Sequence, residues 1–171
     1  MHIAHHDRHR HPVEQHQGTV APHHGLPAPV HPRLLPRRTA ALAAGVELPP
    51  ADCYFGCDAP DADLLHAEEL RAAETAGAVS LRPALGAAPE GTMAFVRHRI
   101  AAEADEAWEL LNAGARVYVC GDGSRMAPGV REAFRILYRD RMPAADDSAA
   151  ERWLNGLMAA GRCIEDVYAA G

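Results

Sequence analysis

The stretch Val117–Pro128, VYVCGDGSRMAP, decides the fold because it joins a strand to a helix through a tight turn. Its first three residues are β-branched or aromatic, as in a buried strand, and Gly121 and Gly123 let the backbone turn sharply. From Met126 onward, apolar residues recur at helical spacing. We therefore expect Cys120 at the carboxyl edge of a strand, where open α/β sheets bind nucleotides.

This turn by itself is weak evidence for a ligand. Most Gly-x-Gly turns are only tight connections, and most strand-end cysteines are small packed hydrophobic residues. The same turn would nevertheless place backbone N–H groups and a helix N-terminus beside the Cys120 side chain, which suits an anionic cofactor next to a soft group.

Strands and helices alternate along the rest of the chain. Buried strands are predicted at Cys53–Cys57 and Ala78–Ala84, and helices at Asp61–Thr75 and Thr92–Asn112. Thr39–Gly45 has the pattern of a helix end, with the glycine just past it.

The last helix has the clearest boundaries. Ser148 precedes it and Glu151 follows three residues later, which is the spacing of a capping box, and Gly161 ends it. Trp153 and Leu157 belong to its inward face. The alternation of strands and helices predicts an α/β fold with a parallel sheet and helices on both faces.

Composition indicates one domain and excludes several classes of protein. The chain has 171 residues, of which 48% are hydrophobic, and its net charge is −6. It contains no lysine, so all its basic residues other than histidine are arginines. An acidic chain without lysine gives little support for nucleic-acid binding. No segment reaches the ~18 apolar residues of a membrane span, and the N-terminus lacks a signal peptide, so we expect a soluble, cytoplasmic protein. Cys53 and Cys57 with His66 lack a fourth zinc ligand, and no metal site is predicted.

Residues 1–38 differ in composition from the rest and contain nine of the eleven histidines. We expect them to be irregular or disordered, with a nucleotide-binding domain over residues 39–171. The polar run Pro12–Gln17 is not expected to form a buried central strand. A shifted reading frame in a GC-rich gene would explain such a segment. A histidine-rich metal-binding tail, with His5-His6 and His23-His24, is the competing interpretation.

From about Ala51 to its end, the chain resembles the C-terminal pyridine-nucleotide-binding subdomain of diflavin reductases, the NADPH–haemoprotein reductases. The motifs that carry the resemblance occur in the family's order: Tyr54–Cys57 with Asp63–Leu70, then Val117–Pro128, then Gly161–Tyr168. The resemblance implies a Rossmann-like domain of the ferredoxin reductase type. It also implies an enzyme in which NADPH or NADH passes hydride to FAD, and FMN then passes electrons to a haem protein. FAD-binding and flavodoxin-like domains would be partners lying outside this chain.

The resemblance also assigns roles to three residues. Cys120 matches a cysteine beside the nicotinamide, Asp166 an acidic residue that stabilises charge near that ring, and Tyr168 an aromatic residue that covers the flavin. Taken singly, each has a simpler interpretation, as a core thiol, a solvated tail residue and a packing aromatic. The remaining candidates lie in the turn or at the start of the helix after it, and we expect them to contact the nucleotide or its phosphates: Gly121, Asp122, Gly123, Arg125 and Met126.

Two departures from the family pattern concern the nucleotide. The family holds the 2′-phosphate with a Ser-Arg pair and a Lys-x-Tyr, whereas this chain has Gly86-Ala87 and Met93–Phe95. Arg82 and Arg97 are the candidates to contact a phosphate instead. The family's first Gly-Thr-Gly turn survives only in Gly18–Pro22, which makes Thr19 a candidate ligand.

A second interpretation is a catalytically silent nucleotide-binding or interaction module from a truncated gene. Under either interpretation, the chain alone is expected to be incomplete and inactive, because no region of it could form an FAD-binding barrel.

Overall fold

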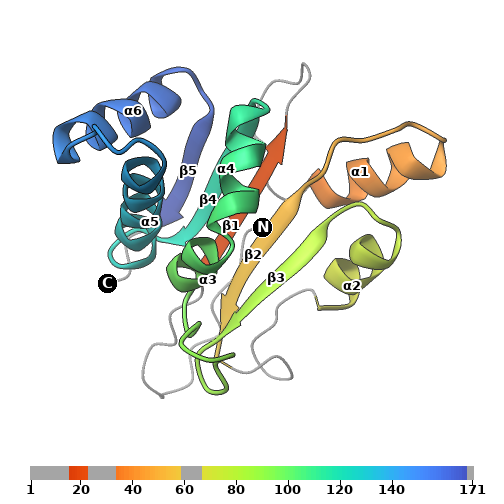
Figure 1. Cartoon of the computed structure of the whole chain (residues 1–171). Helices are drawn as coiled ribbons and strands as arrows, with labels where there is room; N and C mark the ends of the chain where they lie inside the picture. Colours follow the sequence, from red (N-terminus) through yellow and green to blue (C-terminus); the bar gives the residue numbers. More distant parts are fainter. Residues whose placement is uncertain (1–15, 23–33, 59–66, 169–171) are drawn as a thin grey trace.

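A mixed sheet of strand order β3-β2-β1-β4-β5 is the centre of the fold (Figure 1). The computed structural model describes residues 16–22 by their backbone, and residues 34–58 and 67–168 with their side chains. The strands are β1 His16–Pro22, β2 Asp52–Cys57, β3 Ser80–Leu85, β4 Ala115–Asp122 and β5 Cys163–Tyr168. The helices are α1 Leu34–Ala43, α2 Ala67–Thr75, α3 Val96–Ala102, α4 Ala104–Asn112, α5 Met126–Arg141 and α6 Asp147–Ala159.

The pleat of β2 directs side chains into two cores. Cys53, Phe55 and Cys57 point to the face that α1 and α2 cover, where they pack with Leu70, Ala73, Ala78 and Val79. Tyr54 points to the other face, which α3 to α6 cover. The core on this second face also includes Val117, Val119, Met126, Val130, Phe134 and Leu154. Helices on both faces of β2 to β5, which all run in one direction, confirm the predicted Rossmann-like α/β fold.

The central strand β1 corrects two expectations. It runs antiparallel to both β2 and β4, so the sheet is mixed rather than wholly parallel. Residues 1–38 are not irregular throughout, because His16–Pro22 forms this strand and α1 begins at Leu34. The reason is that β2 and β4 would each leave a row of N–H and C=O groups unpaired in the sheet interior. The backbone of β1 can pair with those groups whether its side chains are polar or apolar. Pro12–Gln15 of the polar run lies outside the described residues, as do both histidine pairs.

Two helix boundaries also differ from the predictions. The Thr92–Asn112 helix is two helices, α3 and α4, which meet at Glu103. The N-cap of α6 is Asp146, whose carboxylate accepts a hydrogen bond from the Ala149 N–H at 2.7 Å, so the capping box at Ser148 is wrong. Aspartate is as good an N-cap residue as serine, and Asp146 comes first along the chain. The Asp61–His66 part of the predicted second helix lies outside the described residues.

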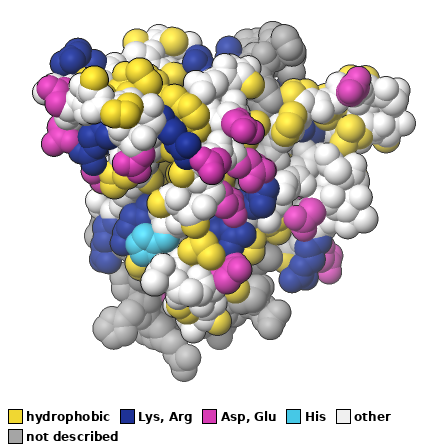
Figure 2. Space-filling view, in the orientation of Figure 1, with side chains coloured by type: hydrophobic (Ala, Val, Ile, Leu, Met, Phe, Trp, Pro, Cys, Tyr) yellow, Lys and Arg dark blue, Asp and Glu magenta, His cyan; other side chains and the backbone are white. Residues whose placement is uncertain are grey.

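The described helices are all too short or too polar to cross a membrane. Figure 2 shows that the face of the molecule in view mixes arginine and acidic side chains rather than gathering one sign of charge.

A cluster of charges, with Asp52 as its buried member, lies between β2, β3 and the α3–α4 junction. Arg82 on β3 contacts Glu106 at 2.7 Å, Asp52 at 3.5 Å and Glu103 at 3.8 Å. Asp52 is only 3% exposed, and its Oδ2 has no hydrogen-bond partner among the described residues. Burial, with the charges of Glu106 and Glu103, raises the pKa of Asp52 above its ordinary value, although Arg82 opposes this shift.

The raised pKa of Asp52 gives a test by pH. Because the folded-state pKa exceeds the unfolded-state value, the native protein holds a proton that the unfolded chain releases, and stability falls as pH rises through that window. We expect Asp52→Asn to raise the Tm at pH 8 by about 2–4 °C, the shift that ~1 kcal/mol gives a domain of this size, and to have less effect at pH 4. Thermal melts at both pH values measure this, with the exposed Asp140→Asn as control. A lower Tm at pH 8 would show that the attraction to Arg82 dominates.

Candidate functional site

The carboxyl edge of the parallel strands brings the candidate residues together. The strands β2, β3, β4 and β5 all end at this edge, and β1 begins there, with His16 paired to Gly121. The turn from β4 into α5 lies at this edge between the start of β1 and the end of β5. This is the place at which the turn sequence predicts a nucleotide site.

Asp122 holds this turn in shape. Its Oδ1 accepts hydrogen bonds from the Ser124 N–H at 2.7 Å and the Ser124 hydroxyl at 2.6 Å, and its Oδ2 accepts one from the Arg125 N–H at 3.1 Å. Its side chain is buried. Asp122 therefore acts first as an internal cap of the turn, which is a role that its place in the Gly-Asp-Gly sequence did not reveal.

The structure explains why both positions of the turn, 121 and 123, are glycine. Gly121 has a φ of 134°, which side chains disfavour. The Gly123 N–H donates to the Tyr168 carbonyl at 2.8 Å. A Cβ at Gly123 would lie 3.1 Å from both that carbonyl oxygen and Val167 Cγ2. The turn can touch the end of β5 only because this residue has no side chain.

The three predicted catalytic residues lie on neighbouring strands. Cys120 on β4 pairs with Asp166 on β5, and Tyr168 pairs with Asp122. Paired residues of parallel strands, and those two apart, share one sheet face, so Cys120, Asp166 and Tyr168 face the same side. Their environments differ, because Cys120 is 4% exposed whereas Tyr168 is 54% exposed.

The Cys120 thiol is neutral at physiological pH. Burial, with the nearby Asp166 carboxylate, raises the pKa of Cys120 to about 12, and a hydrogen bond from the Asp166 backbone opposes part of that shift. A thiol in this state is neither a nucleophile nor a metal ligand. It offers a small, polarisable, uncharged surface at the strand end.

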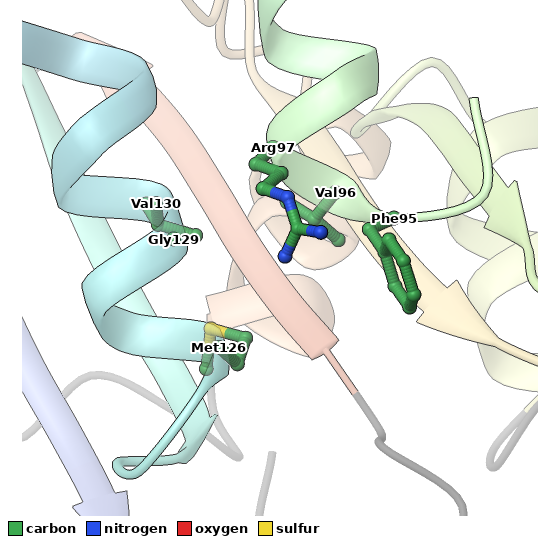
Figure 3. Close-up of a pocket in the computed structure, with 6 residues that line it drawn as sticks. All are labelled: Phe95, Val96, Arg97, Met126, Gly129 and Val130. Carbon is green, nitrogen blue, oxygen red and sulfur yellow. The ribbon is translucent and has the colours of Figure 1, made fainter. Parts of the chain in front are cut away.

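Arg97 and Met126 line one small pocket, at the other side of the turn (Figure 3). It lies between the start of α3 and the first turns of α5, and Phe95, Val96, Gly129 and Val130 complete it. The Arg97 guanidinium carbon lies 4.5 Å from the centre of the Phe95 ring. Sequence reasoning missed Gly129, although a glycine inside a strongly helical pattern is a signal of close packing.

Two candidate ligands lie away from these groups. Arg82 is engaged by the carboxylates of Asp52, Glu103 and Glu106. Thr19 lies in the middle of β1, paired with Cys53 and Tyr118, and the antiparallel β1 ends with Pro22 beside Ala115, at the opposite edge of the sheet. The structure therefore does not bring Thr19 to the β4–α5 turn.

Metal ligands do not gather in the described part of the chain. Within it, no three histidine, cysteine or acidic side chains are placed to hold an ion. Cys53 and Cys57 are buried in the core beneath α1 and α2, and His66 lies outside the described residues.

Comparisons with known proteins show what the chain is similar to. It is 35% identical over 131 residues to bifunctional cytochrome P450/NADPH–P450 reductase 2 of Bacillus subtilis, a match of 77% of this chain and 12% of that protein. It is 30% identical over 115 residues to the human NADPH–cytochrome P450 reductase, covering 67% of this chain and 17% of the relative. The Dictyostelium discoideum reductase is 27% identical over the same length, with the same coverage. No protein-family model matches.

These homologues support the diflavin reductase family for this chain. The chain spans less than a fifth of the length of these relatives.

Gly123 gives a test of the geometry of the turn. We expect Gly123→Ala to destabilise the fold by ~1–3 kcal/mol, because the new Cβ would overpack against the end of β5. Gly156→Ala in α6 is the matched control, since nothing lies within 4 Å of a Cβ there, and it should stabilise the helix by ~0.5–1 kcal/mol. Denaturant unfolding measures both. Equal stabilisation by the two substitutions would contradict the close approach at Gly123.

Proposed function

We propose that this chain is the NAD(P)H-binding portion of a flavoprotein oxidoreductase, which delivers hydride to FAD for electron transfer to a haem protein. The observation that carries the proposal is the grouping of Cys120, Asp166 and Tyr168 beside the turn that Asp122 shapes. The relatives named above, which include NADPH–cytochrome P450 reductases and their fusions with a cytochrome P450, support the same role.

The residues present fit a pyridine dinucleotide. Arg97 supplies a cation for phosphate on one side of the turn, and Cys120 supplies an uncharged surface for a ring on the other. The nicotinamide supplies the hydride when bound, and its ring becomes positively charged as the hydride leaves. The Asp166 carboxylate would stabilise that charge, and the neutral Cys120 would not oppose it.

Tyr168 would cover the flavin from the end of β5. Its exposed ring contributes on the order of 1 kcal/mol of stacking, which is too little to retain FAD. An FAD-binding domain from outside this chain would therefore complete the active site, with a flavodoxin-like domain holding FMN and accepting electrons after it.

The displaced Thr19 favours a second candidate function, nucleotide binding without catalysis. With β1 antiparallel, Gly18–Pro22 forms strand and ends at the edge opposite the β4–α5 turn, so these residues do not form the family's first turn beside the ligand. A silent module would bind nucleotide through the β4–α5 turn but would transfer no hydride.

Reconstitution of activity separates the two functions. We expect the purified chain alone to be colourless and inactive with NADPH and ferricyanide. Addition of the FAD-binding domain of a homologous reductase should then give measurable flavin reduction in stopped-flow absorbance. Asp166→Asn should slow that step by about tenfold or more, the loss that removal of one electrostatic contact to a transition state produces. Cys120→Ala should slow it less, because it removes only a polarisable, uncharged surface beside the ring.

The exposed Glu109→Gln on α4 is the control and should leave the rate unchanged. A yellow preparation of the chain alone that reduces ferricyanide would contradict the need for a second domain. Tight NADPH binding without any flavin reduction would favour the silent module.

A further inference from the structure

We propose that Arg97 distinguishes a nucleotide that carries a 2′-phosphate from one that lacks it. This inference rests on the proposed function and names the part of the nucleotide that Arg97 would bind. Its starting point is that the usual Ser-Arg and Lys-x-Tyr are missing, which leaves Arg82 and Arg97 as the candidates.

Arg82 is excluded by its partners. Three carboxylates surround its guanidinium, of which Glu106 lies at 2.7 Å, and the cluster lies beneath the α3–α4 junction. An incoming phosphate would have to displace these acids and would meet their negative charge. Arg82 therefore serves as a structural counterion.

Arg97 has a different environment. It extends from α3 into the space between Phe95 and α5, close to Met126 (Figure 3). Its cation lies 4.5 Å from the centre of the Phe95 ring, an arrangement that holds the guanidinium. No hydrogen bond joins its N–H groups to another residue in the described part of the chain. Among the described residues, no carboxylate forms an ion pair with Arg97, whereas Arg82, Arg99, Arg131, Arg135, Arg139 and Arg141 all have one.

Gly129 makes room for this arginine. A Cβ at that position of α5 would lie 3.3 Å from Arg97 Cδ and 3.4 Å from its Nη1. A glycine inside a helix destabilises it relative to alanine, and no positive φ requires one here. The lack of a side chain at Gly129 therefore gives the Arg97 stem room to pass close to α5.

The chemistry of the guanidinium selects phosphate. Its planar set of N–H donors matches phosphate oxygens in paired, charge-assisted hydrogen bonds. The pocket lies next to the β4–α5 turn, at the edge where the proposed function places the dinucleotide. One such contact in place of the family's several predicts a preference of roughly 10- to 100-fold for NADPH over NADH.

Calorimetric titration of the full chain with NADPH and with NADH tests the inference. We expect the wild-type chain to bind NADPH at least tenfold more tightly. Arg97→Gln should weaken NADPH binding to the level of NADH and leave the Kd of NADH unchanged, whereas Arg97→Lys should keep part of the preference. Gly129→Ala should reduce the preference by less than Arg97→Gln does, because the charge stays and the new methyl group only shifts the Arg97 side chain. Arg152→Gln on α6 is the matched control and should change neither Kd.

The outcomes separate this inference from the proposed function. Equal binding of NADPH and NADH by the wild-type chain would overturn the role of Arg97 and leave the proposed function intact. A strong NADPH preference that survives in Arg97→Gln would assign the phosphate to another group and would also overturn it. Failure of both nucleotides to bind would contradict the proposed function and this inference together.

Discussion

The hydrogen bond from the Gly123 N–H to the Tyr168 carbonyl, at 2.8 Å, joins the β4–α5 turn to the end of β5. It forms because Asp122 folds the turn on itself and because Gly123 has no side chain to separate it from β5. The end of β5 is thereby fixed against β4, which sets Asp166 opposite Cys120. Arg131 of α5 donates two hydrogen bonds to the Glu165 carboxylate of β5, one of them from Nε to Oε1 at 2.7 Å. This contact joins β5 to α5 as well. The position of every group proposed for hydride transfer follows from these contacts.

Local sequence was enough to predict this part of the molecule. The strand β4, its glycine turn and the amphipathic α5 are specified by residues close together in the chain, so their pattern predicted them. The same holds for α6, except at its start, where Asp146 and Ser148 compete as caps and only the observed backbone decides between them. The hydrogen bonds of Asp122 are also local, since they reach only Ser124 and Arg125. The sequence did not reveal them because an aspartate in this turn could equally well contact a bound nucleotide.

Long-range pairing explains what the sequence could not predict. The strand β1 has a polar beginning and no apolar period, and its position depends on the edges of β2 and β4, which lie far along the chain. Arg82 and Arg97 were equal candidates by residue type. They differ because Glu103 and Glu106 lie at the α3–α4 junction, above Arg82, while Arg97 lies beside Phe95 and Gly129. Such differences arise from topology, which the one-dimensional pattern does not contain.

The antiparallel placement of β1 has a consequence for cooperativity. On one side of it, α1 to β3 form a continuous stretch with their own small core, and on the other side α4 to β5 form a second continuous stretch. The backbone ladder between the two stretches consists of the seven residues of β1. Each stretch is rich in local contacts, whereas the β1–β4 pairing closes a long loop and is entropically slow. The insertion of β1 should therefore be a late event in folding, and the core that Tyr54 of β2 shares with α3 to α6 helps the domain to unfold as a single body.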